Sequence, residues 1–513
     1  MCGIAGIWRI HGAHPLDIGA VHESVRAMLD LLAHRGPDAE GFCVVDGAGV
    51  VGHRRLSIMD PTGGDQPIYN TDRSRAIVAN GEIYNFPELR TDLAVDHIFV
   101  TGSDSEAILH LYDRHGADLV DHLEGMYAFA IVDGTRLVLA RDPLGIKPLY
   151  WAEQDGQLWF ASELKALAPY CREVREFPPG TICVSDVGTH MFYEVPNTTP
   201  VVRPDSEYIA AVRKTLDAAV VSHCMSEVGI GAFLSGGLDS SIIAALAIQH
   251  LGSLHTFSVG VDGSSDLAAA RLVADHLGTI HHEYIITADE VLARLPDIIH
   301  SLESFDEDLV RSAVPCYFAS RLAAQHTKVI LTGEGADELF AGYTYHRAMA
   351  DPGALHIELR RTVTTLHDIN LQRADRLTML HSIEGRVPFL DLRMVALAQR
   401  IPVALKLHGD PSTPDNALVE KWVLRKAFED MLPSSIAWRR KLQFDEGSGT
   451  ADLLPQLLAG LMSEDAASEY RRANPDVVLR SAEECHYHRV LVESYEHPAP
   501  VLANVARWAR DRI

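Results

Sequence analysis

The sequence predicts two domains: an α+β domain first, then an α/β domain built on a parallel sheet and completed by a helical C-terminal part. The chain has 513 residues, enough for two or three domains. Short strand-like runs fill residues 2–195, whereas strands alternate with helices after residue 205. Between these parts, residues 195–205 concentrate Pro, Thr and Asn, which is typical of a linker. We therefore expect domains over 2–195 and 205–513.

The first domain shows apolar or alternating runs bounded by Gly, Asp and Pro, which is the pattern of short strands. Two segments between them have helical spacing instead. Such a mixture predicts antiparallel sheets with helices. The expected strands are 42–45, 75–79, 128–132 and 136–140, and the expected helices are 24–32 and 105–115.

The second domain opens with an amphipathic helix around 209–220. An apolar strand then leads through a glycine-rich turn into a helix, and two further strands follow with a helix between them. This alternation predicts a doubly wound parallel sheet. The expected elements are strands 228–234, 255–259 and 281–286 and helices 241–251 and 266–277, with mostly helix after Gly342.

Composition excludes several classes of protein. A net charge of −25 argues against binding of nucleic acid through a general basic field. No apolar run approaches the ~18 residues of a membrane span, and no signal peptide is evident. The seven Cys form no Cys-x-x-Cys pair and no regular framework. We expect a soluble cytoplasmic protein with no nucleic-acid or membrane partner.

A glycine-rich loop, Ser235–Ser241 (SGGLDSS), separates a predicted buried strand from a helix. Gly236 and Gly237 allow close backbone approach, and the helix N-terminus offers N–H groups to an anion. Ser235 and Ser240 add hydroxyl donors. No Lys precedes the Ser pair, so this is a phosphate cradle of a type other than Walker A. The alternative is a tight turn with a Ser cap.

A second loop, 331–338 (LTGEGADE), also follows an apolar strand. Because carboxyl ends of parallel strands meet at one sheet edge, the two loops are expected to converge there. Phosphate alone would repel Asp239 and Asp337, whereas a Mg²⁺ held by both would bridge triphosphate oxygens. The sequence therefore predicts a metal site at Asp239 and Asp337.

The first loop closely resembles the pyrophosphate loop of ATP pyrophosphatases, and both loops together resemble the synthetase domain of the asparagine synthetase family. The likeness extends through residues 302–315, 375–391 and 420–449. It implies cleavage of ATP to AMP and pyrophosphate, with an acceptor carboxylate attacking the α-phosphate.

The resemblance also implies roles for single residues. Lys441 contacts phosphate together with the loop, and Glu334 helps ammonia attack the adenylate. Read without the resemblance, Lys441 belongs to a solvated basic run and Glu334 is an ordinary loop acid. The implied ATP and pyrophosphate residues are Leu234, Ser235, Gly236, Gly237, Asp239, Ser240, Val259, Thr332 and Gly333.

The chain begins Met1-Cys2-Gly3. Removal of Met1 would give Cys2 a free α-amine, whose pKa of about 7.7–8 suits a general base. A nucleophile that carries its own base is the N-terminal form of an activated nucleophile. The alternative is a Cys that merely starts an apolar strand.

Further segments, taken in order, resemble a class II glutamine amidotransferase domain, which implies an αββα sandwich of the Ntn-hydrolase type. These segments are 34–38, 52–58, 80–85, 102–106 and 141–145. By this resemblance Cys2 attacks the glutamine amide, and Asn80 and Gly81 form the oxyanion hole. Arg55 would pair with the α-carboxylate of glutamine, and Glu82 and Asp104 with its α-ammonium. Read alone, Asn80-Gly81 would be a hairpin turn.

The two resemblances imply glutamine-dependent amidation of a carboxylic acid, with aspartate converted to asparagine as the default. One alternative is an amidotransferase of specialised metabolism that uses another acid; a second is a non-catalytic scaffold. A β-lactam synthetase is disfavoured by Cys2, and the family allows a homodimer. Candidates for the acceptor pocket are Asp306, Arg311 and Ser382–Arg386, where Gly385 leaves space.

Overall fold

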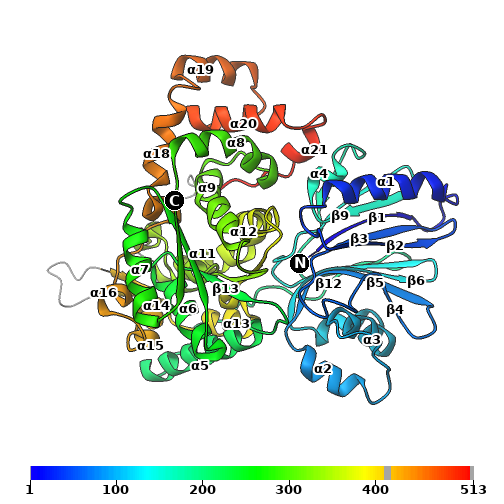
Figure 1. The fold of residues 1–513 in the computed structure, drawn as a ribbon, viewed down its shortest axis with the longest axis horizontal. Coiled ribbons are helices and arrows are strands. Elements are labelled where there is room, and N and C mark those ends of the chain that lie inside the picture. The colour runs from blue at the N-terminus through cyan, green and yellow to red at the C-terminus, as the bar shows by residue number, and fades with distance from the viewer. Residues whose placement is uncertain (1, 350, 410–417, 509–513) are drawn as a thin grey trace.

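The computed structural model describes residues 2–349, 351–409 and 418–508. Two six-stranded antiparallel sheets stack face to face in the N-terminal part, on the right of Figure 1. The first sheet has the order β10 (Arg175–Glu176), β8 (Tyr150–Gln154), β9 (Gln157–Ala161), β1 (Gly3–Arg9), β3 (Gly49–Arg55), β2 (Ala39–Val45). The second has the order β12 (Gly188–Met191), β11 (Thr181–Val184), β7 (Arg136–Arg141), β6 (Gly125–Asp133), β5 (Arg75–Ile83), β4 (Ile68–Tyr69).

Helices cover the outer faces of both sheets. The first sheet carries α1 (Ile18–Leu31) and α4 (Leu164–Leu167), and the second carries α2 (Phe86–Leu93) and α3 (Ser105–His115). Apolar side chains that alternate along the strands fill the space between the sheets, among them Ile4, Trp8 and Phe160. This αββα sandwich confirms the predicted fold of the N-terminal part.

A five-stranded parallel sheet organises the C-terminal part. Its order is β15 (Ile280–Ile285), β14 (His255–Gly260), β13 (Ile230–Phe233), β16 (Val329–Leu331), β17 (Glu384–Arg386). The chain builds outward from β13 to β15 and then returns to the other side of β13 at β16. The loops after β13 and β16 therefore lie next to each other at the point where strand order reverses, which is where such sheets bind ligands.

Helices pack on both faces of this sheet, with α6 and α7 on one side and α9 on the other. The predicted α/β class and helical C-terminal part are confirmed. The helices are α5 (Asp205–His223), α6 (Leu238–Leu251), α7 (Ser265–Leu277), α8 (Ala288–Leu302), α9 (Glu307–Ala323), α10 (Ala336–Phe340), α11 (Pro352–Thr364), α12 (Asn370–Met379), α13 (Leu392–Arg400), α14 (Val403–Lys406), α15 (Trp422–Phe428), α16 (Ser434–Ala437), α17 (Phe444–Ser448), α18 (Thr450–Leu458), α19 (Glu464–Ala473), α20 (Ala482–Glu493) and α21 (Ala499–Leu502). A small hairpin joins β18 (Leu407–Gly409) and β19 (Leu418–Glu420).

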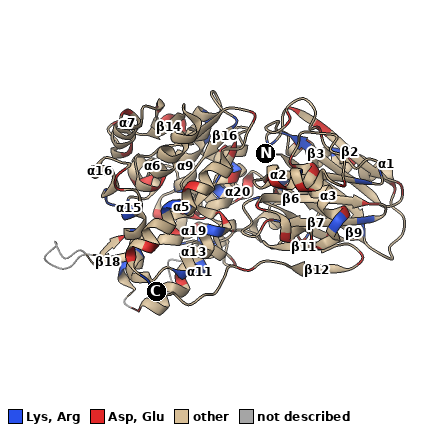
Figure 2. Ribbon diagram, turned by 90° about the horizontal axis from the view of Figure 1, so that it is seen from below, with Lys and Arg blue, Asp and Glu red and all other residues tan. Residues whose placement is uncertain are grey.

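One local alternative from the sequence is wrong. Asn80 and Gly81 form no hairpin turn, because they lie inside β5 and pair with Ala128 and Tyr127 of β6. Residues 192–204 connect the two parts without helix or strand. Acidic and basic segments are interspersed over both parts in the view of Figure 2. Within the described ranges, every helix is too short or too polar to cross a membrane.

Candidate active sites

Cys2 lies just before β1, next to the middle of β5 on the facing sheet. Its backbone N–H donates to Asn80 Oδ1 at 2.9 Å, and both residues are buried. This bond fixes the amide so that Asn80 Nδ2 has no hydrogen-bond partner among the described residues. A buried N–H donor without a partner is costly unless a ligand accepts from it. Asn80 Nδ2 is therefore placed to stabilise negative charge near the thiol.

Gly81 follows Asn80 where β5 passes very close to β6. A Cβ atom at this position would lie 2.1 Å from the carbonyl oxygen of Met126, so no side chain fits. Gly81 and Cys2 both line a small cavity, together with Arg55, Glu82 and Asp104. The structure thus gathers around one cavity Arg55, Gly81, Glu82 and Asp104, and Asn80 lies beside it, bonded to Cys2.

The polar groups of this cavity differ in how far they are already paired. Arg55 donates to Asp65 at 2.6 Å and to the Asp60 carbonyl oxygen at 2.6 Å. Asp104 accepts from the Ile83 N–H at 2.7 Å, and burial raises its pKa to about 6. Burial also raises the pKa of Glu82 well above its usual range. Asp104 therefore resists ionisation until a cation reaches it, whereas Glu82 already faces the guanidinium of Arg386, 3.0 Å away.

Burial raises the pKa of the Cys2 thiol as well. A buried neutral thiol is a weak nucleophile, so it needs a base at the site. Met1, on whose removal the sequence argument depends, lies outside the described residues. A free α-amine on Cys2 itself would be such a base.

The C-terminal part contributes to the same cavity, which the sequence did not predict. Glu384 of β17 lines it, and Arg386 pairs with Glu82 at 3.0 Å. Sequence analysis placed residues 382–386 in the acceptor pocket. That assignment is wrong for Glu384 and Arg386, because β17 is the edge strand of the parallel sheet that faces the N-terminal sandwich. No sequence signal separated the two sites at this strand.

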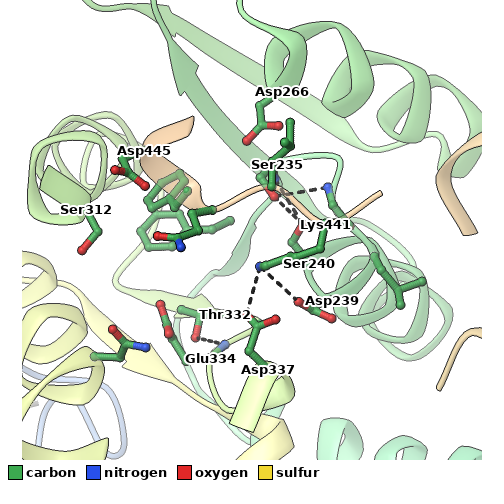
Figure 3. Close-up of a pocket in the computed structure, with 18 of the residues that line it drawn as sticks. Ser235, Asp239, Ser240, Asp266, Ser312, Thr332, Glu334, Asp337, Lys441 and Asp445 are labelled. Carbon is green, nitrogen blue, oxygen red and sulfur yellow. Dashed lines mark hydrogen bonds and ion pairs between the residues drawn. The ribbon is translucent and has the colours of Figure 1, made fainter. Parts of the chain in front are cut away.

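A larger cavity of about 250 Å³ opens at the carboxyl ends of β13 and β16 (Figure 3). The Ser235 loop forms one side of it. Gly236 has φ +70°, and a Cβ there would lie 2.4 Å from the Ala269 carbonyl carbon. The Ser235 hydroxyl accepts from the Gly237 N–H at 3.2 Å and lies 3.1 Å from the Ser240 hydroxyl. The loop is therefore preshaped, as an anion cradle requires.

Two lysines, buried Lys421 and half-buried Lys441, link the carboxylates of the two loops. Lys421 Nζ lies 2.5 Å from Asp239 Oδ2 and 2.6 Å from Asp337 Oδ1. Lys441 Nζ lies 2.9 Å from Asp337 Oδ2 and 3.9 Å from Asp239 Oδ2. The sequence prediction therefore placed Lys441 and both acids correctly in one site but missed Lys421. Its only signal was its place in the 420–449 segment.

This charge cluster shifts the pKa values of its members. The pKa of Asp337 falls far below its usual range, since the attraction of Lys421 and Lys441 outweighs burial. The pKa of Lys441 rises, because Asp337 and Asp239 more than offset burial. Asp239 Oδ1 is buried and accepts no hydrogen bond within the described part of the chain. Carboxylate oxygens such as these are ligands that suit Mg²⁺.

The rest of the cavity wall is divided between apolar and polar sides. Leu234 and Val259, both buried, lie on the apolar side, and Thr332 and Gly333 line the turn after β16. A Cβ on Gly333 would lie 2.9 Å from the Cβ of Asp239, so only Gly fits between the loops. Glu334 forms an ion pair with buried Arg373, a residue that the sequence analysis did not single out.

Residues near the C-terminus close the polar side of this cavity. Trp508 lines it, and its ring packs edge-on against Tyr343 at 5.2 Å. The Trp508 N–H donates to Asp306 Oδ2 at 3.0 Å. Asp306 thus supports the wall, and Arg311 is engaged by Glu483 at 2.7 Å; neither lines the cavity. Their expected place in the acceptor pocket stays a prediction, while nearby Ser312 does line the cavity.

Comparisons with known proteins agree with this arrangement. Residues 1–189 match the glutamine amidotransferase domain family, and residues 211–356 and 348–510 match the asparagine synthase family. Fold and matches define a glutamine-dependent amidotransferase joined to an ATP-using synthetase domain, which makes the protein a ligase.

Curated relatives narrow the class. The chain is 37% identical to asparagine synthetase B (glutamine-hydrolysing) of Escherichia coli, over 97% of this chain and 92% of the relative. It is 37% identical to the asparagine synthetase of Asparagus officinalis, over 96% and 86%. Identity reaches 42% with asparagine synthetase 3 of Arabidopsis thaliana, over 82% and 75%. The chain belongs to the family of glutamine-hydrolysing asparagine synthetases.

Proposed function

We propose that this enzyme converts L-aspartate, glutamine and ATP into L-asparagine, glutamate, AMP and pyrophosphate. The observation that carries the proposal is the pair of cavities in one chain, each with the groups that one half-reaction needs. The first holds a thiol beside a free amide donor. The second holds a phosphate loop beside two acids and two lysines. Family membership and the names of its relatives favour aspartate as the acceptor.

In the first cavity, Cys2 would attack the side-chain carbonyl carbon of glutamine. With Met1 removed, the α-amine of Cys2 takes the thiol proton and then gives it to the leaving nitrogen. Asn80 Nδ2 and the Gly81 N–H would donate to the oxyanion. The C–N bond breaks to release ammonia, and water hydrolyses the thioester to give glutamate and free thiol.

Charged groups of the same cavity would choose an amino acid over a simple amide. Arg55 would bind the α-carboxylate of glutamine. That carboxylate would then take the place of the exposed Asp65, which pairs with Arg55 in the free protein. Asp104 and Glu82 would receive the α-ammonium. An arriving ammonium lets buried carboxyl groups ionise, so binding of glutamine and loss of a proton are coupled.

In the second cavity, an oxygen of the acceptor carboxylate would attack the α-phosphorus of ATP, and pyrophosphate would leave. The Ser235 loop and Lys441 would hold the phosphates, with adenosine against Leu234 and Val259. Asp239 and Asp337 fit Mg²⁺, which when bound would neutralise phosphate charge and orient its oxygens. Lys421 and Lys441, which pair with these two acids in the free protein, would then turn toward the phosphates.

Ammonia would attack the acyl carbon of the adenylate, and AMP would leave. Glu334 would take the proton that the new amide nitrogen gives up. The acceptor would lie on the polar side of the cavity, between Arg373 and the wall formed by Ser312 and Trp508.

We further propose that the domains span residues 2–195 and 205–513, that the enzyme works in the cytoplasm and that it forms a homodimer.

Mass spectrometry of the complete reaction tests the proposal. The protein is incubated with glutamine, Mg²⁺, ATP and either L-aspartate or one of a panel of other carboxylic acids. We expect asparagine, AMP and pyrophosphate in equal amounts with aspartate. Pyrophosphate release with another acid, and no asparagine with aspartate, would reassign the acceptor to specialised metabolism. If no acid causes release of pyrophosphate, the protein would be a non-catalytic scaffold.

A further inference from the structure

Three histidines lie together at the amino ends of the strands, the end of the sheet opposite to the nucleotide cavity. His255 begins β14, His282 lies within β15 and His326 follows the end of α9. Pairing of β14 with β15 sets His282 beside Phe257, two residues after His255 on the same face. Three separate segments of the chain thus bring an imidazole to one place.

The three rings are stacked, and their nitrogen atoms lie close to one another. His255 Nδ1 lies 2.9 Å from His282 Nε2. The rings of His282 and His326 have their centroids 3.9 Å apart. One nitrogen from each ring lies within 4.8 Å of the other two. A zinc ion binds imidazole nitrogens at about 2.0–2.1 Å, so the stacked rings would have to turn about their side-chain torsions to aim all three nitrogens at one ion.

Access also favours a cation here. His326 is exposed and the other two are half-buried, so an ion can enter from solvent. An imidazole nitrogen with a free lone pair is a common ligand of transition metals.

Other groupings of possible ligands in the described residues are already engaged in ion pairs. Glu176, beside His367 and Asp368, accepts from Arg141 at 2.7 Å. Asp113, beside His97 and His110, pairs with Arg75, and His110 contacts Glu106. In the histidine cluster, by contrast, the hydrogen bond joins two of the histidines themselves, His255 and His282.

We propose that His255, His282 and His326 form a binding site for a divalent transition-metal cation of the zinc, nickel or copper class, with water completing the coordination. Three imidazole nitrogen donors select such ions over Mg²⁺, which prefers oxygen. The bound ion would tie β14, β15 and the segment after α9 together. This site is independent of the glutaminase and synthetase chemistry.

Equilibrium dialysis of the full-length protein with Zn²⁺ tests the proposal. It is done in excess Mg²⁺ and in a Cys2→Ala background, so that neither the acidic loops nor the reactive thiol binds zinc. We expect one equivalent of bound Zn²⁺ and a raised Tm. The double variant His282→Asn/His326→Asn should lose both, whereas His14→Asn, which removes an exposed histidine elsewhere, should lose neither. Equal zinc binding by the double variant and its parent would overturn the proposal.

A second measurement covers the case in which the double variant fails to fold. Electron paramagnetic resonance of one equivalent of Cu²⁺ added to the Cys2→Ala protein counts nitrogen ligands without altering any histidine. Coupling to three imidazole nitrogens is expected. Coupling to fewer than three would contradict the site. Synthesis of product with ammonia in place of glutamine reports the fold of each variant, because none of the three histidines lines either proposed active-site cavity.

Discussion

Arg386 of the parallel sheet forms an ion pair with Glu82 of the N-terminal sandwich, with Nη2 and Oε2 3.0 Å apart and both side chains buried. The same guanidinium donates to Glu384 at 2.6 Å and to the His223 carbonyl oxygen at 2.7 Å. One arginine therefore joins a proposed glutamine-binding carboxylate to the synthetase domain. Arg35 makes a parallel link, from the Cys2 carbonyl oxygen to Asp375.

Replacement of this arginine should destabilise the protein strongly. In Arg386→Met, Glu82 and Glu384 lose a shared buried cation, for which we expect a loss of about 3–5 kcal/mol in the free energy of unfolding. Urea denaturation measures it. The matched control is Arg213→Met, which breaks an exposed pair with Asp430 and should cost less than about 1 kcal/mol. Equal losses of unfolding free energy in the two variants would show that the buried ion pair contributes no more to stability than the exposed one.

Cys2→Ala should separate the two activities. Because Cys2 is the proposed nucleophile, the variant should hydrolyse no glutamine, while synthesis from ammonium salts continues near the rate of the parent. Glutamate release and pyrophosphate release report the two sites separately. The control Cys43→Ala removes a buried thiol of β2 that takes no part in either proposed site and should keep both activities. Loss of ammonia-dependent synthesis in Cys2→Ala would contradict the two-site scheme.

Glutamine binding should weaken in acid. Burial raises the pKa of Asp104 to about 6, so below that pH the free site holds a neutral carboxyl that gives the α-ammonium no charge partner. The Kd of glutamine should therefore rise as the pH falls through about 6 and become constant above it. Calorimetry on Cys2→Ala measures binding without hydrolysis. The double variant Cys2→Ala/Asp104→Asn should bind more weakly and lose this acid limb; a retained limb would assign it to another group.

How much of this could be predicted from the sequence depends on how local each signal is. The α+β and α/β classes and the strand–loop–helix units followed from periodicity and from the glycine loops, since these patterns are set by neighbours in the chain. The αββα arrangement, the proposed glutamine-binding residues and the role of Lys441 came from the resemblance of ordered motifs to known families. Each of these residues lies in a segment whose residue types restrict the chemistry that the segment can support.

What the sequence could not show is which segments meet across the fold. Lys421 reaches Asp239 over 182 positions, and Arg35 reaches Asp375 over 340. Glu384 and Arg386 were assigned to the acceptor because they follow a synthetase motif, yet β17 faces the other domain. Trp508 carries no motif at all. Long-range packing decides such contacts, and a single sequence holds no record of it.

Asp239→Asn and Asp337→Asn should each abolish ATP-dependent synthesis and leave glutaminase activity intact. Each change removes one anionic oxygen ligand from the proposed Mg²⁺ site while it keeps side-chain size. Pyrophosphate release is followed across a Mg²⁺ titration. Asp266→Asn serves as the control, because Asp266 lines the same cavity but pairs with Arg439 instead of the lysines. Product formation at the parental rate by either of the first two variants would remove that residue from the metal site.

The wall at Trp508 should set affinity for the acceptor and leave affinity for ATP unchanged. Trp508 lines the cavity and is held there by Asp306 and Tyr343, whereas Leu234 and Val259 are the residues proposed to contact adenosine. In Trp508→Ala we expect the KM of aspartate to rise on the order of tenfold, equal to about 1.4 kcal/mol, with the KM of ATP constant. Steady-state kinetics with ammonia isolate this step. The control Trp438→Ala, at a tryptophan outside the cavity lining, should change neither constant. A parallel rise in both constants for Trp508→Ala would mean that the wall shapes the whole cavity, and the acceptor would have to be placed elsewhere.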